Sequence, residues 1–365
     1  MGLFTILAYK GLITMVQNLS EVIRNKIRAE GPITVAQYME LCLMHPDFGY
    51  YTTRDPLGAA GDFTTAPEMT QVFGELIGLW CVEMWKKIGS PAKFTLCELG
   101  PGRGTLLADA LRAAQMVPDF INGLDVRLLE ASPKLREKQA STLAAWKPKW
   151  VSTLAELPDQ PVLFIANEFF DALPIRQFVH MPDGWKERRI AVTAKDTFTL
   201  VAMPAPDAPT YESDEGAVQE MCPNAGEWAS AIARPILKNR GAALLIDYGD
   251  DEVIGETLQA VANHRQAHLL TTAGYADITA HVSFAPIMTA ARKIGCRVYG
   301  PVPQGEFLLA LGAKERTEAL LRSATPDQQR TLKAALHRLT DAASMGVLFK
   351  MVSFTDKATA APPGF

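Results

Sequence analysis

The chain has 365 residues, of which 48% are hydrophobic, so its length and composition predict one large domain or two modest domains with a sizeable core. The formal net charge is −4 and no long basic run occurs, which excludes duplex nucleic acid as a partner because phosphate binding needs a concentrated basic surface. The five cysteines are scattered without a C-x-x-C pair, a pattern that predicts a reducing compartment and no metal site.

The beginning of the chain is mostly apolar but is too short to span a bilayer, and it carries Lys10. It lacks a convincing signal-peptide cleavage site and the arginines of a transit peptide. We therefore expect residues 1–14 to be an upstream extension that contributes little to the fold, with Met15 as an alternative start to Met1. We also expect no stable membrane insertion.

The next hundred residues alternate between helical and irregular patterns. Residues 18–48 predict two helices, the second of which begins with a capping box formed by Thr34 and Gln37. Residues 52–68 are polar and glycine-rich without periodicity, and long loops of this kind inside a compact domain are often functional. A long helix is predicted over residues 71–87.

Residues 95–106 predict a strand, a tight glycine loop and a helix. The apolar run ends at Glu98, glycines follow at 100, 102 and 104, and apolar residues then recur at helical spacing. The spacing is G-x-G-x-G, with Thr105 where the dinucleotide fingerprint has its third glycine. The pattern is similar to motif I of the class I S-adenosylmethionine methyltransferases, in which glycine lets a ligand lie against bare backbone.

A second strand over residues 124–129 ends at Glu130. Acidic residues at this place bind ribose hydroxyls in doubly wound nucleotide folds, although a solvated charge at a strand end is the alternative. A third, wholly apolar strand at 162–166 is followed by Asn167, Glu168 and Asp171, which we expect at the carboxyl edge of the sheet, where such sheets bind ligands.

These patterns predict an α/β fold with a Rossmann-like, mostly parallel sheet, an N-terminal helical region and a β-meander insertion. Two late strands, the last near residues 347–353, fit a methyltransferase sheet whose final strand runs antiparallel. The expected divisions are N-terminal helices with an active-site loop, the methyltransferase domain, an insertion, and a disordered tail. The N-terminal helices and active-site loop take residues 1–90. The methyltransferase domain takes residues 91–175 and 225–355, the insertion takes residues 176–224, and the tail takes residues 356–365.

Five motifs occur in an order that resembles the MidA family, which includes a mitochondrial assembly factor of respiratory complex I. The motifs are GAAGDFTTAPE at 58–68, ELGPGRGT at 98–105, NEFFDALP at 167–174, DITAHV at 277–282 and PQGEFL at 303–308. The resemblance covers nearly the whole chain from about residue 18. It implies a class I methyltransferase fold, S-adenosyl-L-methionine as cofactor, and methylation of an arginine on a complex I subunit. The chain departs from the family at Ser283, where many members have aspartate.

The cofactor-binding residues that we expect come from the glycine loop, the two strand ends and the loop before the long helix. They are Glu98, Gly100, Pro101, Gly102, Gly104, Glu130, Asn167, Gly61, Asp62, Phe63 and Thr65. The segment 61–63 is interpreted as a lid with Phe63 over the site, or equally as a turn with a buried aromatic anchor.

Three residues are candidates for the chemistry. A guanidinium is planar and binds carboxylates bidentately, so Glu168 and Asp171 are interpreted as an arginine clamp. The alternative is that Glu168 caps a helix and Asp171 pairs with Arg176. His281 is a candidate proton acceptor, because an imidazole titrates near neutrality, or else a structural residue.

Three functions therefore remain open: a protein arginine methyltransferase acting on a complex I subunit, a small-molecule methyltransferase, and an assembly chaperone that binds the cofactor without essential turnover. The insertion favours a protein substrate because it adds surface rather than closing a pocket. We expect a cytoplasmic protein if the source is bacterial, and a mitochondrial matrix protein if it is eukaryotic.

Overall fold

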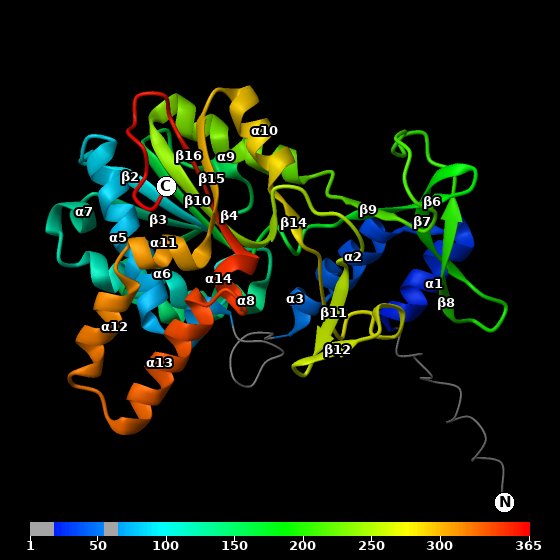
Figure 1. Cartoon of the computed structure of the whole chain (residues 1–365), viewed down its shortest axis with the longest axis horizontal. Helices are drawn as coiled ribbons and strands as arrows, with labels where there is room; N and C mark the ends of the chain where they lie inside the picture. Colours follow the sequence, from blue (N-terminus) through cyan, green and yellow to red (C-terminus); the bar gives the residue numbers. More distant parts are fainter. Residues whose placement is uncertain (1–17, 55–64) are drawn as a thin grey trace, which may run out of the picture.

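The computed structural model describes residues 18–54 and 65–365, which form two units that lie side by side along the longest axis of the molecule (Figure 1). The larger unit is a sheet with helices on both faces, and the smaller unit combines the N-terminal helices with antiparallel sheets. The expected extension at 1–14 and the candidate residues 61–63 lie outside the described residues. Within the described ranges, no helix combines the length and apolar character needed to cross a bilayer.

An eight-stranded sheet organises the larger unit, and its main path runs β15-β16-β10-β5-β2-β3-β4. Neighbouring strands from β10 to β4 are parallel, whereas β16 is antiparallel to both β10 and β15. The predicted α/β class with a final antiparallel strand is confirmed. The strands are β2 (Phe94–Leu99), β3 (Leu124–Leu129), β4 (Lys149–Val151), β5 (Val162–Asn167), β10 (Gly241–Asp250), β14 (Val282–Ser283), β15 (Arg297–Pro303) and β16 (Phe349–Thr355).

The two faces of this sheet are covered by different helices because its central strands β2 and β5 are buried along their whole length. Helices α5 (Gln71–Lys87) and α6 (Thr105–Ala114) pack on one face, and α9 (Ala225–Asn239) and α10 (Phe284–Ile294) on the other. Helices α5 and α6 approach closely at Gly78, where a Cβ would lie 2.2 Å from the Ala110 carbonyl oxygen. This packing fixes the start of α6 at the carboxyl edge of the sheet.

The remaining helices of the larger unit are short or peripheral. They are α4 (Ala66–Met69), α7 (Pro118–Asn122), α8 (Pro133–Thr142), η1 (Ala144–Trp146), η2 (Leu154–Glu156), α11 (Gln304–Ala310), α12 (Ala313–Leu321), α13 (Pro326–Thr340) and α14 (Met345–Leu348). The C-terminal helices add Phe307 and Leu339 to the core that contains α5.

The smaller unit has one core that joins the N-terminal helices to two antiparallel sheets. This core includes Ile23, Tyr38, Ile190 and Ile278. The five-stranded sheet follows the order β1-β7-β6-β9, with β8 beside β7, and the three-stranded sheet follows the order β12-β11-β13. The elements are α1 (Leu19–Glu30), β1 (Ile33–Thr34), α2 (Val35–Met44), α3 (Tyr50–Thr53), β6 (Arg176–Met181), β7 (Gly184–Val192), β8 (Phe198–Met203), β9 (Val218–Met221), β11 (Gln259–Ala262), β12 (Arg265–Ala267), η3 (Leu269–Thr271) and β13 (Asp277–Thr279).

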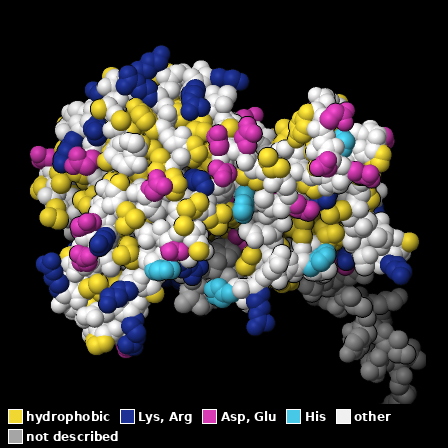
Figure 2. Space-filling model, viewed as in Figure 1, with side chains coloured by type: hydrophobic (Ala, Val, Ile, Leu, Met, Phe, Trp, Pro, Cys, Tyr) yellow, Lys and Arg dark blue, Asp and Glu magenta, His cyan; other side chains and the backbone are white. Residues whose placement is uncertain are grey.

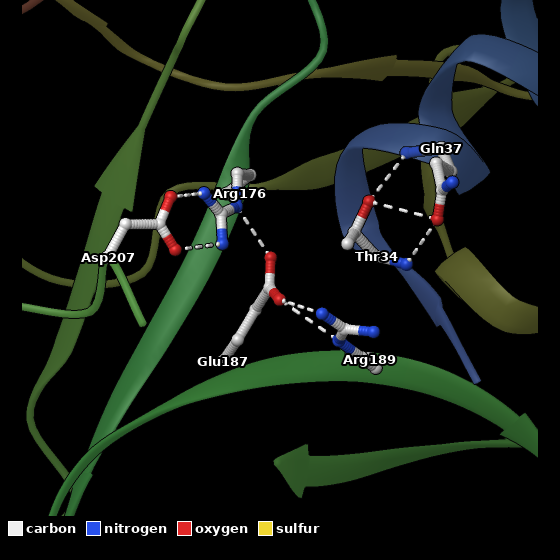
Figure 3. Close-up of polar contacts among 6 residues, drawn as sticks. All are labelled: Thr34, Gln37, Arg176, Glu187, Arg189 and Asp207. Atoms are coloured by element: carbon white, nitrogen blue, oxygen red, sulfur yellow. Dashed lines mark hydrogen bonds and ion pairs between the residues drawn. The ribbon is translucent and has the colours of Figure 1, made fainter. Parts of the chain in front are cut away.

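Paired charges and a helix cap stabilise the smaller unit (Figure 3). Glu187 has a fully buried side chain and accepts hydrogen bonds from Arg176 Nε at 2.6 Å and Arg189 Nη2 at 2.7 Å. Arg176 also pairs with Asp207, so the carboxylate of Glu187 is buried together with its counter-charges. The predicted capping box is confirmed, because Gln37 N donates to Thr34 Oγ1 at 3.1 Å and Thr34 N to Gln37 Oε1 at 2.9 Å.

The C-terminal segment differs from the expected disordered tail at 356–365. Asp356 accepts hydrogen bonds from Ala358 N and Thr359 N, and the Thr359 side chain is fully buried. The ring of Phe365 lies 5.4 Å from that of Phe307. The prediction of disorder was wrong because small and proline residues conceal these tertiary contacts.

Core membership also divides the chain differently from the expected boundary at residue 90. Helix α5 lies before that boundary but packs in the core of the larger unit. Residues 259–279, expected in the methyltransferase domain, contribute Ala260 and Ile278 to the core of the smaller unit. Strand β7 of the predicted insertion contributes Ile190 to that second core and pairs with β1 of the N-terminal region.

Candidate functional site

A cavity of about 940 Å³ opens at the carboxyl edge of the large sheet, where β2, β3, β5 and β10 end. The larger unit supplies Glu98, the glycine loop, Glu130 and the turn after β5. The smaller unit supplies the opposite wall through α2, α3, β11 and β13, including Met44, Tyr51 and Asp277. The space-filling view shows histidines and acidic side chains near the middle of this face of the molecule (Figure 2).

The glycine loop between β2 and α6 takes a backbone course that side chains would disfavour. Gly100, Gly102 and Gly104 have φ angles of +60°, +54° and +81°. A Cβ on Gly100 would lie 3.2 Å from Phe169 Cδ2, a ring atom of another cavity-lining residue. The loop thus presents bare backbone to the cavity just before the N-terminus of α6, and Pro101 lines the cavity beside it.

Glu98 lies at the base of the cavity with only 2% of its surface exposed. Its Oε2 is buried and accepts no hydrogen bond from the part of the chain that the structure describes. Burial, followed by the neighbouring charge of Glu130, raises the pKa of Glu98 to about 8. A buried acceptor of this kind needs a donor, which a bound ligand can supply.

Glu130 is held in place by a hydrogen-bond network that reaches the glycine loop. Its oxygens accept from Ser132 N at 2.8 Å and from Gln139 Nε2 at 2.9 Å. Gln139 Nε2 also donates to the Gly102 carbonyl at 2.7 Å, and Gln139 Oε1 accepts from Trp150 Nε1. Burial raises the pKa of Glu130 although these donors lower it. The network fixes the carboxylate relative to the loop, which a solvated charge would not require.

Glu168 and Asp171 both line the cavity on the turn that follows β5. Burial and the nearby Asp171 raise the pKa of Glu168 to about 8, and burial raises that of Asp171 to about 6. Asn167 Nδ2 donates to Glu168 Oε1 at 3.1 Å, and Asp171 Oδ1 is buried without a partner among residues 18–54 and 65–365. Glu168 has a φ of +50°, an uncommon conformation for a residue with a side chain.

Of the two structural alternatives for these acids, the fold contradicts the one for Asp171. Arg176 bonds to Glu187 and Asp207 rather than to Asp171. Residues 168–174 form a turn that leads to β6. A hydrogen bond from the backbone N–H of Ala66, the first residue of α4, lowers the pKa of Glu168, so this side chain also lies at the start of a helix, as the alternative expected. Both residues line the cavity.

The wall that faces these acids contains a histidine, two tyrosines and a further aspartate. Tyr51 donates to Asp277 Oδ1 at 2.6 Å, and the rings of Tyr248 and His281 lie 5.4 Å apart. Burial lowers the pKa of His281, so its ring is neutral near pH 7. Asp277 also contributes to raising the pKa of Glu168, which places the two carboxyl groups within electrostatic reach.

Sequence reasoning assigned no role in the site to Asp277 or to Tyr51. The available signal for Asp277 was its position at the start of the DITAHV motif.

Of the other expected residues, Thr65 and Asn167 line the cavity. Glu68 accepts a hydrogen bond from Thr105 Oγ1 at 2.5 Å and so anchors the start of α6.

Comparisons with known proteins point to one family. Residues 76–302 match a family described as "Putative S-adenosyl-L-methionine-dependent methyltransferase". The chain is 36% identical over 355 residues to the protein arginine methyltransferase NDUFAF7, mitochondrial, of Mus musculus, a match that covers 89% of this chain and 81% of the relative. The protein of the same name from Danio rerio is 34% identical over 364 residues, covering 92% of this chain and 86% of the relative.

A solved structure has the same fold as this chain. It is that of a COG1565 superfamily member from Burkholderia thailandensis bound to S-adenosyl-homocysteine. The TM-score is 0.82 at 27% sequence identity, and the match covers 95% of this chain and 94% of the other.

Proposed function

The chain belongs to a family of S-adenosyl-L-methionine-dependent methyltransferases, and from that premise we propose that it transfers a methyl group to an arginine side chain of a protein. Two curated relatives named as protein arginine methyltransferases support this choice of acceptor. We extend the proposal to a subunit of respiratory complex I as substrate, following the resemblance of the five motifs. The relatives are named as mitochondrial, which supports a matrix location if the source is eukaryotic and a cytoplasmic one if it is bacterial.

The half of the cavity near the glycine loop suits the cofactor. The orphaned Oε2 of Glu98 can accept a hydrogen bond from a ligand amine or hydroxyl, and Glu130 can bind ribose hydroxyls at the end of β3. Gly100 and Gly102 line the cavity with positive φ angles, so a ligand can approach their backbone. Gly104 does not line the cavity, and its Cβ position lies 3.2 Å from Leu143 Cδ1. When bound, S-adenosyl-L-methionine supplies an electrophilic methyl group on its sulfonium.

The observation that carries the proposal is the pair of cavity-lining acids formed by the half-buried Glu168 and the buried Asp171. Among the described residues, no ion pair with lysine or arginine occurs at either of them, although the charge of Asp171 is close enough to raise the pKa of Glu168. Two neighbouring carboxylates in a cavity wall favour a cationic ligand, because the protein's own cations do not offset their charge. A guanidinium fits best, since its planar fork can engage two carboxylates at once.

The chain's own groups then orient the acceptor and remove its proton. Glu168 and Asp171 align one guanidinium nitrogen with the methyl group, which is the main requirement of a displacement reaction. A carboxylate whose pKa is raised to about 8 is a better proton acceptor than an ordinary one, so Glu168 can take the proton that the attacking nitrogen releases. His281, neutral near pH 7, is the second candidate for this role.

Mass spectrometry of arginine methylation in complex I subunits tests the proposal. Cells with the gene, without it, and with the Glu168→Gln variant should be compared. We expect one or more methylated arginines that disappear in the deletion and in Glu168→Gln. If Glu168→Gln restores the assembly of complex I in cells without the gene but restores no methylation, the protein acts as a chaperone. If no protein arginine changes but a methylated metabolite does, the small-molecule function replaces this one.

A further inference from the structure

Asp247 lies directly behind the candidate substrate acids but does not line the cavity. It is the seventh residue of strand β10, beside β5, and only 1% of its surface is exposed. Its neighbour Tyr248 does line the cavity. A buried carboxyl group without access to a ligand must serve the protein itself.

The carboxylate of Asp247 accepts hydrogen bonds from three backbone N–H groups. Its Oδ2 accepts from Phe170 N at 2.9 Å and from Asp171 N at 3.2 Å, and its Oδ1 accepts from Tyr248 N at 3.0 Å. Two of these donors belong to the turn that carries Glu168 and Asp171. Asp247 therefore fixes the backbone of that turn rather than a side chain.

The turn needs such an anchor because its backbone is strained. Glu168 N continues the sheet by donating to the Ile246 carbonyl at 2.9 Å, and the chain then enters the left-handed region at Glu168, with φ at +50°. Residues other than glycine adopt this conformation only when surrounding contacts enforce it. The bonds from Phe170 N and Asp171 N to Asp247 begin just after this point and hold the turn in its unusual course.

We propose that Asp247 is a positioning residue that holds residues 167–171 so that Glu168 and Asp171 point into the cavity. The proposal rests on the proposed function, because it assumes that those two acids bind the substrate. It adds a residue that does not line the cavity.

Two variants of the full-length protein separate positioning from general folding. Asp247→Asn keeps the shape but offers only one accepting oxygen, whereas Asp247→Ala removes all three hydrogen bonds. Asp250→Ala is the matched control, since Asp250 lies on the same strand with a side chain that is 67% exposed. The rate is measured as tritium transfer from labelled S-adenosyl-L-methionine to a protein extract from cells that lack the gene. Calorimetry with S-adenosyl-L-homocysteine counts the functional binding sites and gives their affinity.

We expect the transfer rate per binding site to fall about tenfold in Asp247→Asn and about 100-fold in Asp247→Ala, the scale of loss for a displaced reacting group. The affinity for S-adenosyl-L-homocysteine should change less than about twofold, and Asp250→Ala should match the wild type. A purely structural residue would lower the number of binding sites but leave the rate per site intact, and that result in Asp247→Asn would overturn the proposal. A parallel loss of affinity would also overturn it, since Asp247 would then act on the cofactor half.

A crystal structure of Asp247→Asn decides the matter independently of activity. We expect Glu168 to leave the left-handed conformation and the backbone of residues 167–171 to shift with it. An unchanged turn would overturn the inference. If the wild type transfers no label while the turn moves as expected, the proposed function fails and the positioning role stands.

Discussion

The charge of Glu168 and Asp171, rather than their shape, is what a guanidinium clamp requires. Glu168→Gln and Asp171→Asn keep nearly the same volume, so we expect methyl transfer to fall by about 100-fold or more through lost alignment and neutralisation. Cofactor affinity should hardly change, because both residues lie on the turn after β5 and not on the glycine loop. Single-turnover transfer and calorimetry measure the two effects. Full activity in both variants would rule out the clamp.

A lysine in place of the target arginine offers a further comparison with the same assay. An ammonium is a point charge without the planar fork, so a lysine peptide should be a poor substrate for the wild type. Equal rates for the two peptides would show that the acids recognise positive charge alone.

The raised pKa values of the same acids predict a pH dependence. Because the pKa of Glu168 is raised to about 8 and that of Asp171 to about 6, the charged clamp of the free enzyme becomes more populated as pH rises. We expect kcat/KM to increase from pH 6 to a plateau above about pH 8. A profile that stays flat over this range would contradict the assignment of Glu168 as a charged ligand of the substrate.

Stability should respond to pH in the opposite direction. The folded-state pKa of Glu168 lies above the ordinary value of about 4.3, so the folded state holds this proton more tightly than the unfolded state does. Its contribution is present below pH 4 and is lost as pH rises through about 8. The melting temperature should therefore fall from pH 5 to 8, and Glu168→Gln should reduce that fall by about 2 °C or more. Thermal unfolding of both proteins at several pH values measures the difference.

At the scale of elements, the glycine loop is where the sequence was most informative. Three glycines between an apolar run and a helical pattern are compatible with few local structures other than a tight loop between a strand and a helix. All three adopt positive φ angles. Gly102→Val should abolish cofactor binding, because a β-branched side chain at a φ of +54° strains the loop and covers bare backbone. Gly216→Val is the matched control, since Gly216 has a φ of +84° with nothing within 4 Å of its Cβ position.

Calorimetry should show a loss of affinity of about 100-fold or more in Gly102→Val and little change in Gly216→Val. Circular dichroism checks that both remain folded. If Gly102→Val binds the cofactor as the wild type does, the loop is not part of the cofactor site.

Other elements could not be predicted from local patterns. The short strands β11, β12 and β13 contain three or four residues each, too few for a period-two signal, and they are defined by pairing with one another. The left-handed backbone at Glu168 is equally invisible in the sequence, since it depends on Asp247, which lies 79 residues later in the chain. Residues such as Tyr51 and Asp277 become neighbours only when the fold is complete.

At the scale of the whole molecule, the cavity lies between two units with separate cores. The larger unit supplies the glycine loop, Glu98 and Glu130, whereas the smaller unit supplies Tyr51 and Asp277 opposite the clamp. The units are also linked directly, because Lys134 of α8 donates to the Thr53 carbonyl at the end of α3. This arrangement assigns cofactor recognition mainly to one unit and part of substrate recognition to the other.

Asp277→Asn tests this division of labour. The amide can still accept the hydrogen bond from Tyr51 but loses the charge that faces Glu168. We expect methyl transfer to an arginine peptide to fall about tenfold or more, mainly through a higher KM, because the substrate loses electrostatic attraction. Cofactor affinity should stay within about twofold of the wild type, since Asp277 belongs to the smaller unit.

Steady-state kinetics and calorimetry on the same preparation give both values. Glu256→Gln, a change at a half-exposed acid of the same region, serves as the control. An unchanged KM would remove Asp277 from the substrate wall, and a loss of cofactor affinity would show that the smaller unit also holds the cofactor.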